Sequence, residues 1–151
     1  MQTELCEHVA EIQISYRPAI ARKPQIRSIL DAYTEFLHFY PKDTIALQER
    51  FFAMYLNTSN RVIGVFPVSS GGIAGTCVDI RLILSVALKV LATGLILCHN
   101  HPSGSLEPSA ADKMITNKIK EACTFMDIRL FDHLIISSEG NYYSFSKERI
   151  I

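Results

Sequence analysis

Apolar and polar residues follow one another along this chain in two different rhythms. Between residues 10 and 16 they alternate one by one, which predicts a half-buried strand that ends at Pro18. Between residues 28 and 40 the apolar positions recur at steps of three and four, which predicts an amphipathic helix that ends at Pro41. The chain is therefore expected to open with a strand followed by a helix.

After this point, apolar runs are separated by turn-forming residues. Residues 44–48 form a short helical or extended lead-in, and the turn cluster at 57–60 joins two strands into a predicted hairpin. A glycine-containing loop at 69–75 precedes a helix for which Asp79 is the expected N-cap. The strands predicted after residue 50 are 51–56, 62–68, 95–99, 128–137 and 142–145, and the helices are 80–92 and 108–125.

This order of elements predicts an α/β fold, with a mixed β-sheet flanked by α-helices. The chain has 151 residues, of which 48% are hydrophobic, so it can bury a core without disulfides or a structural metal. The run at 95–99 is apolar and ends in polar residues, as expected for a buried strand whose end carries function.

The charge of the chain argues against a general nucleic-acid binder. It has 15 basic and 15 acidic residues, so its formal net charge is zero. A protein that binds nucleic acid mainly through phosphates needs an excess of Lys and Arg, although a local basic patch would escape this count. Nucleic acid is therefore a partner that the charge does not support.

Targeting signals and cysteines indicate a cytoplasmic protein. The first ten residues carry two glutamates and no apolar core, so we expect no signal peptide, and no apolar run approaches the roughly 20 residues of a membrane span. Cys6, Cys77, Cys98 and Cys123 form no C-x-x-C pair. We interpret them as small, buried, apolar side chains of a reduced protein without a membrane partner.

Residues 98–112 carry the candidate chemistry. His99 and His101 are two positions apart at the end of a strand, so both imidazoles are expected on one face. Asp112 lies in the first turn of the following helix, which can lean back over the strand end. Two histidines and a carboxylate, with a fourth position left to water, are the ligand set of a catalytic zinc site.

Each part of this pattern also has an ordinary explanation. An isolated His-x-His pair is weak evidence for a metal, because histidines also cap strands and pack. Ser109, followed by Asp112 three residues later, is a typical capping box at a helix start. The two interpretations are compatible, because an acid at a helix N-terminus can also bind a metal.

The spacing His99-x-His101, seven residues, Ser109, two residues, Asp112 resembles the JAMM motif of the JAB/MPN metalloproteases. The longer string His-Asn-His-Pro-Ser-Gly, followed by Pro-Ser-x-x-Asp, is similar to the bacterial RadC branch of that superfamily, as are residues 72–76, 130–136 and 143–145. The resemblance covers about two-thirds of the chain.

The resemblance also implies a domain organisation. It predicts a RadC-like JAB/MPN-type domain at 45–151, with a layout like that of cytidine deaminases. Residues 1–44 would be an N-terminal strand and helix extension. Full-length RadC proteins usually add a helix–hairpin–helix region, which is not recognisable here, so we expect the short, stand-alone form.

The same resemblance implies roles for matching residues. His99, His101 and Asp112 would bind one zinc ion, and an upstream glutamate would hold the water at its fourth position and act as general base. Glu49 is the best match for this glutamate, and Glu107 is its main competitor. The implied protein is a zinc metallopeptidase, a hydrolase that cuts a peptide or isopeptide bond in a peptide or protein substrate.

Four nearby residues complete the expectations. Ser109 would help to stabilise the oxyanion, again by resemblance. His133 is expected to make an internal hydrogen bond rather than to bind the metal, and Asp132 could orient a ligand histidine. Cys98 is expected on the opposite strand face, in the core.

Two other functions stay open beside the zinc metallopeptidase. RadC proteins are linked by name to DNA repair, which would make this chain a DNA-associated accessory factor. The fold could also serve as a non-catalytic metal-binding interaction module, because a fold does not fix a function. A homo-oligomer is compatible with all three.

Overall fold

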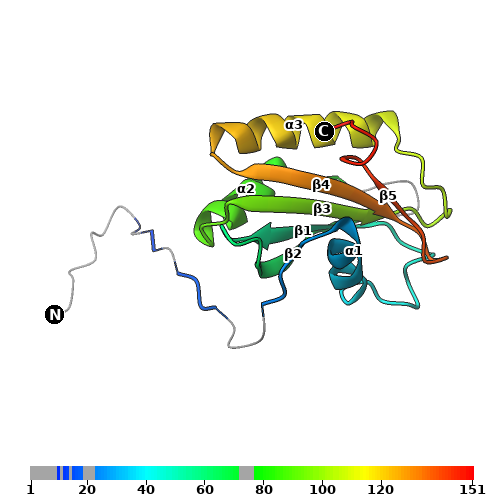
Figure 1. The fold of residues 1–151 in the computed structure, drawn as a ribbon, viewed down its shortest axis with the longest axis horizontal. Coiled ribbons are helices and arrows are strands. Elements are labelled where there is room, and N and C mark those ends of the chain that lie inside the picture. Colours follow the sequence, from blue (N-terminus) through cyan, green and yellow to red (C-terminus); the bar gives the residue numbers. More distant parts are fainter. Residues whose placement is uncertain (1–9, 11, 14, 19–22, 72–76) are drawn as a thin grey trace.

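A computed structural model describes residues 10, 12–13, 15–18, 23–71 and 77–151. Within them, five strands form one mixed sheet in the order β2-β1-β3-β4-β5, with helices on both faces (Figure 1). This confirms the predicted fold class. The elements are α1 (Ile29–Leu37), β1 (Arg50–Leu56), β2 (Val62–Ser70), α2 (Ile80–Lys89), β3 (Gly94–Asn100), α3 (Ala110–Phe125), β4 (Arg129–Ile136) and β5 (Tyr142–Ser144).

Strand β3 is the centre of the sheet. It pairs antiparallel with β1 and parallel with β4, and all of its residues are buried. Because both faces are covered, its sequence is apolar without alternation, as predicted. The parallel connection to β4 runs through α3, so the N-terminus of α3 lies near the carboxyl end of β3.

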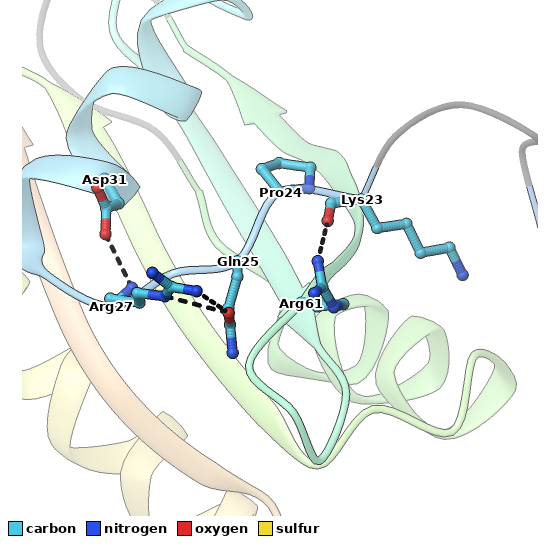
Figure 2. Close-up of a pocket in the computed structure, with 6 residues that line it drawn as sticks. All are labelled: Lys23, Pro24, Gln25, Arg27, Asp31 and Arg61. Atoms are coloured by element: carbon cyan, nitrogen blue, oxygen red, sulfur yellow. Dashed lines mark hydrogen bonds between the residues drawn. The ribbon is translucent and has the colours of Figure 1, made fainter.

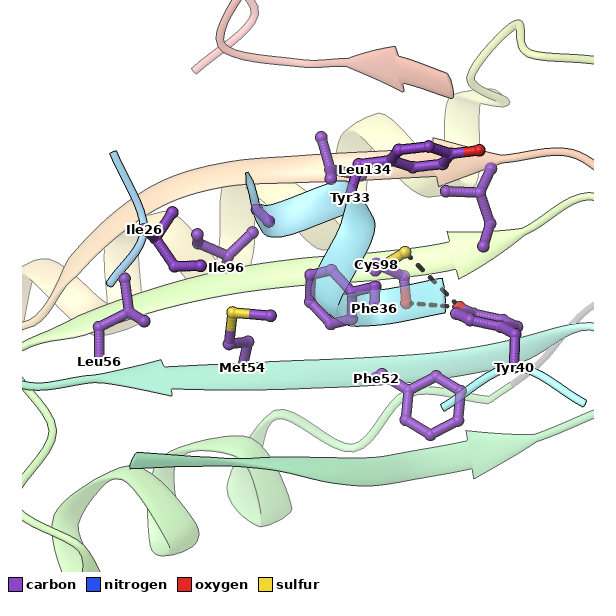
Figure 3. Close-up of a cluster of buried hydrophobic side chains, with 12 residues drawn as sticks. Ile26, Tyr33, Phe36, Tyr40, Phe52, Met54, Leu56, Ile96, Cys98 and Leu134 are labelled. Atoms are coloured by element: carbon purple, nitrogen blue, oxygen red, sulfur yellow. Dashed lines mark hydrogen bonds between the residues drawn. The ribbon is translucent and has the colours of Figure 1, made fainter. Parts of the chain in front are cut away.

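The sheet separates two apolar cores. Helix α1 packs on one face, where Phe36 is fully buried against side chains of β1 and β3 (Figure 3). Helices α2 and α3 cover the other face (Figure 1), where the side chains of Ile83 and Ile119 are buried in the second core. Side chains of β1 alternate between these cores, with Phe52 facing α1 and Phe51 facing α2 and α3. In β1 and β3, side chains of even-numbered residues therefore lie in the core on the α1 side, and those of odd-numbered residues lie on the side of α2 and α3.

Helix boundaries follow the capping residues. Asp79 caps α2 as predicted, and its carboxylate accepts from the N–H of Arg81 at 2.9 Å. Helix α2 ends at Lys89 instead of residue 92, because Leu91 adopts a left-handed backbone conformation with φ of 55°. Helix α3 begins at Ala110 instead of residue 108, since Ser109 is its N-cap.

The predicted strand at residues 10–16 is wrong for the residues described there. Residues 10, 12, 13, 15 and 16 have irregular conformation, and Ile12 is 88% exposed; residues 11 and 14 lie outside the described residues. Alternation specifies which face a strand would bury, but a strand also needs a partner for its backbone groups.

The other differences concern a loop and the cysteines. The predicted loop at 69–75 starts later, since Ser69 and Ser70 belong to β2, and residues 72–76 lie outside the described residues. Cys98 and Cys123 are buried as predicted, but Cys77 is exposed, and Cys6 is outside the described residues. No helix in the described part of the chain is long and apolar enough to cross a membrane.

Replacement of Phe36 by Ala tests whether α1 is part of the cooperative fold. Phe36 is 0% exposed, so we expect the free energy of unfolding to fall by about 3–5 kcal/mol in urea unfolding followed by circular dichroism. Leu30→Ala is the matched control on the same helix, because Leu30 is 59% exposed and should cost less than about 1 kcal/mol. Equal effects of the two substitutions would show that α1 does not pack on the sheet.

Candidate metal centre

The polar end of β3 presents two histidines to the side of the sheet covered by α3. His99 is fully buried, and His101 directly follows the last residue of the strand. Their Nε2 atoms lie 3.0 Å apart. The structure thus brings the two imidazoles to one face, as their spacing predicts.

Asp112 reaches the same place from the first turn of α3. The Ser109 hydroxyl accepts from the N–H of Asp112 at 3.0 Å, and Asp112 Oδ2 accepts from the N–H of Ser109 at 2.7 Å. Fixed by this capping box, the carboxylate oxygens lie 3.4 Å from Nε2 of His99 and 3.4 Å from Nε2 of His101. One carboxylate therefore serves both as helix cap and as member of the cluster.

Hydrogen bonds behind the cluster determine which ring nitrogens carry a hydrogen. The Thr116 hydroxyl donates to the main-chain carbonyl of Asp112 at 2.6 Å, so it accepts from Nδ1–H of His133, also at 2.6 Å. Nε2 of His133 is then unprotonated and accepts from Nδ1–H of His99 at 2.8 Å. This Thr116–His133–His99 relay leaves a free lone pair on Nε2 of His99, directed at the cluster.

His101 is oriented in the same way by a main-chain acceptor. Its Nδ1–H donates to the carbonyl of Ser105 at 2.8 Å, so Nε2 again carries the lone pair. Two lone pairs and a carboxylate that meet at these distances repel one another unless a cation lies between them. The arrangement is therefore built for a positive charge at its centre.

The pKa shifts agree with this preference. Contact with the Asp112 carboxylate raises the pKa of His101 above its usual value, against the effect of burial, and the charge of Glu49 acts in the same direction. Burial alone would raise the pKa of Asp112, but its contacts with His101 and His99 hold it below the usual range. Burial lowers the pKa of His133 well below its usual value, so this ring is neutral at pH 7, as the relay requires.

The distances also suit a single metal ion. Around a tetrahedral ion with bonds of about 2.0–2.1 Å, neighbouring ligand atoms lie about 3.3–3.4 Å apart. The two Nε2 atoms are 3.0 Å apart, Nε2 of His99 lies 3.4 Å from Oδ1 of Asp112, and Nε2 of His101 lies 3.4 Å from Oδ2 of Asp112. His99, His101 and Asp112, whose ligand atoms all lie within 4.8 Å of one another, are thus able to hold such an ion.

Aromatic side chains hold the ring planes of the relay. The Phe51 ring lies parallel to that of His99, with centroids 5.8 Å apart and an interplanar angle of 7°. The Phe145 ring is stacked on His133 at 4.7 Å and 17°. These contacts restrict rotation of both imidazoles, so the lone pair of His99 keeps its direction.

Glu49 lies beside the cluster. Phe51 pairs with His99 across β1 and β3, and Glu49 lies two residues before Phe51, directly before β1. Glu49 and Asp112 line a common hollow of about 270 Å³, called the site hollow below. Its other lining residues are Phe51, Cys77, Val78, Ala111 and Ile115.

Of the remaining predicted residues, Ser109 lies at the site, whereas Glu107 and Asp132 do not. Glu107 is exposed in the loop before α3 and does not line the site hollow. Ser109 is at the helix cap, next to Asp112 in space. Asp132 accepts from the Ser144 hydroxyl at 2.6 Å and from the N–H of Ser146 at 2.9 Å, so the orienting role considered for it belongs instead to His133.

Sequence reasoning missed one member of the relay, Thr116, although its position carries a signal. Thr116 is one turn after Asp112 and on the same stripe as the buried Ile119 and Cys123, so a polar residue at this position marks a buried hydrogen bond. His133 was expected to make an internal hydrogen bond, which is confirmed. Its partner could not be inferred, because the contact depends on the register between β3 and β4.

The fold and the cluster together define a class of protein: an α/β domain with a His–His–Asp group, able to hold a metal, at the carboxyl end of a central strand. The family described as RadC-like JAB domain matches residues 26–150. The chain belongs to this family, as the motif predicts. The match includes α1, which packs against the sheet.

Similar proteins are longer than this chain. The UPF0758 protein of Flavobacterium johnsoniae is 45% identical over 142 residues, which are 94% of this chain and 62% of the relative. The UPF0758 protein of Porphyromonas gingivalis is 36% identical over 143 residues, 95% of this chain and 63% of the relative. That of Streptococcus gordonii is 45% identical over 101 residues, 67% of this chain and 44% of the relative. The chain thus spans less than two thirds of these relatives, whose names state no activity.

Substitution of Thr116 by Val tests the relay. Val keeps the shape of Thr but removes the acceptor for Nδ1–H of His133, so we expect Zn²⁺ to bind about 10–100-fold more weakly in a competition titration with a chelator. Thr124→Val is the matched control, because Thr124 makes the same bond within α3, to the Lys120 carbonyl at 2.9 Å, but is exposed. If both variants bind Zn²⁺ as the unmodified chain does, the relay does not orient His99.

Proposed function

We propose that this chain is a zinc-dependent hydrolase that cleaves an amide bond, in a peptide or in an isopeptide linkage. The observation that carries the proposal is the convergence of His99, His101 and Asp112 within 4.8 Å, beside a hollow lined by Glu49. A bound zinc ion would supply Lewis acidity and a water with a pKa near about 7.

Glu49 is the residue proposed to move protons. Its carboxylate accepts a proton from the attacking water and returns it to the nitrogen that leaves when the amide bond breaks. Its position in the same hollow as Asp112 suits this role. Glu107, exposed outside that hollow, lacks the position.

Ser109 is proposed to stabilise the negative oxygen that develops on the substrate. Its oxygen accepts from the N–H of Asp112, and its own hydrogen is not engaged by any acceptor among the described residues. A hydroxyl held in this way can donate to an oxyanion without first breaking a bond. The helix N-terminus, where Ser109 sits, also favours negative charge.

The site hollow has two chemically different walls. Glu49 and Asp112 supply carboxylates, while Phe51, Val78 and Ile115 supply apolar surface. An extended substrate could place an apolar side chain against this second wall while its amide faces the carboxylates. The substrate class proposed here is therefore a peptide or protein chain.

A second hollow bears on the nucleic-acid alternative. It has a volume of about 330 Å³ and is lined by Lys23, Pro24, Gln25, Arg27, Asp31 and Arg61 (Figure 2). The Arg27 guanidinium already donates to Oε1 of Gln25 at 2.9 and 3.1 Å, and that of Arg61 donates to the Lys23 carbonyl at 3.1 Å. With Asp31 offsetting part of the charge, this hollow gives no specific support to phosphate binding.

Zinc binding is the first test of the proposal. We expect the purified chain to bind one Zn²⁺ per molecule, and His101→Ala to lose at least about 100-fold in affinity, because a ligand is missing. His38→Ala is the matched control, since His38 caps the end of α1, is 68% exposed, and has Glu35 as its only charged partner among the described residues. A chain that takes up no Zn²⁺ at neutral pH would contradict the proposal.

The two glutamates provide the test of catalysis. Glu49→Gln should keep Zn²⁺ but lose about 10²–10⁴-fold in hydrolysis, because Gln cannot accept a proton. The assay measures fluorescence release from internally quenched peptides of randomised sequence and from isopeptide-linked lysine conjugates. Glu107→Gln is the control and should retain full activity. Hydrolysis that survives in Glu49→Gln and disappears in Glu107→Gln would reverse the assignment.

A further inference from the structure

Asn100 is a fully buried polar residue to which the proposed chemistry gives no role. Its side chain makes three hydrogen bonds, all to the main chain just before β1. Nδ2 donates to the carbonyl of Ile45 at 2.7 Å and to that of Gln48 at 2.9 Å. Oδ1 accepts from the N–H of Arg50 at 2.8 Å.

These bonds enclose Glu49. The Gln48 carbonyl belongs to the peptide group that precedes Glu49, and the Arg50 N–H belongs to the peptide group that follows it. A single side-chain amide therefore holds both peptide groups next to the proposed base. The carbonyl of Glu49 itself accepts from the N–H of Gly71 at 2.9 Å, which ties the same residue to the end of β2.

Only an amide fits this position. Two carbonyl partners require two N–H donors, and one N–H partner requires an acceptor, so the orientation of the Asn100 amide is determined by its neighbours. An aspartate would bring a negative charge against two carbonyl oxygens, and an alanine would remove the partner of three partly buried main-chain groups. Because an asparagine side chain makes all three bonds from one buried position, we interpret it as holding this particular segment of main chain.

Tyr40 supports the same junction from the α1 side. Its hydroxyl lies 3.1 Å from the carbonyl of Arg50 and 3.2 Å from that of Cys98, the latter shown as a dashed line in Figure 3. The tyrosine thus ties the start of β1 to β3, but it bonds to neither of the two peptide groups next to Glu49. Asn100 touches both.

We propose that Asn100 is a positioning residue, which fixes the main chain on both sides of Glu49 and so holds its carboxylate on the face of His99 and His101. The inference rests on the proposed function of Glu49 as general base. Side chains alternate between the two faces of a strand. The end of β3 can therefore supply both the histidines and the positioning residue, because Asn100 faces the segment before β1 while His99 and His101 face α3.

Amide hydrogen exchange tests the contact directly, without reference to activity. In Asn100→Ala we expect the amide of Arg50 to exchange at least about ten-fold faster, because it loses its acceptor, while the amide of Ala53 in β1 stays within about three-fold. Asn57→Ala is the matched control. Asn57 Oδ1 accepts from two main-chain N–H groups at 3.0 Å at the opposite end of β1, so its loss should not change the exchange at Arg50.

Asn100→Asp separates this contact from general loss of structure. Asp keeps an acceptor for the N–H of Arg50 but repels the two carbonyls, so the Arg50 amide should exchange more slowly than in Asn100→Ala. Exchange at Arg50 that is unchanged in Asn100→Ala overturns the proposal. Exchange that rises equally at Arg50 and Ala53 in both variants also overturns it, because Asn100 would then support the sheet as a whole.

A double-mutant cycle with Glu49→Gln tests the positioning role. Asn100→Ala should lower kcat by about 100-fold with one Zn²⁺ still bound and KM unchanged, but should change the residual rate of the Glu49→Gln variant by less than about two-fold. Equal losses in both backgrounds overturn the role. A chain without Zn²⁺ or hydrolysis refutes the proposed function instead, and the exchange at Arg50 still decides whether Asn100 holds this segment.

Discussion

The burial of polar groups at the end of β3 is the constraint from which the rest of the site follows. His99 and Asn100 are both fully buried in a central strand that is covered on both faces. A buried polar group without a partner costs about 1–3 kcal/mol, so each of these side chains needs its own partner in a neighbouring element. His99 finds His133 in β4, and Asn100 finds the main chain before β1.

The same requirement gives the cluster its chemical character. The relay that begins at the Asp112 carbonyl and passes through Thr116 and His133 ends by exposing a lone pair on His99. The other groups that face this lone pair are a second ring nitrogen and a carboxylate, so a cation would be its matching partner. The hydrogen bonds that satisfy the buried polar groups are therefore the same bonds that orient the candidate metal-binding group.

The sequence predicts this site better than it predicts the supports behind it. His99, His101 and Asp112 could be grouped because a strand of period two and a helix cap lie within one short segment, so local geometry alone brings them together. The partners of His133 and Asn100 come from distant segments and depend on strand register, which no local pattern contains. The strand predicted at 10–16 is wrong for its described residues for the same reason, since alternation predicts which face would be buried but not which strand would pair with it.

The candidate site depends on residues from both faces of the sheet, and for this reason the packing of α1 affects it. The candidate metal ligands and the relay lie on the side of α2 and α3, whereas Asn100 and Tyr40 anchor the start of β1 from the side of α1. Tyr40 follows α1 by a few residues and is buried with Phe36 in the same core. Packing of α1 thus fixes where Tyr40 lies, and Tyr40 helps to fix where β1 begins. Because Glu49 is the residue immediately before that strand, its position depends on both faces of the sheet, while the candidate metal ligands depend mainly on one.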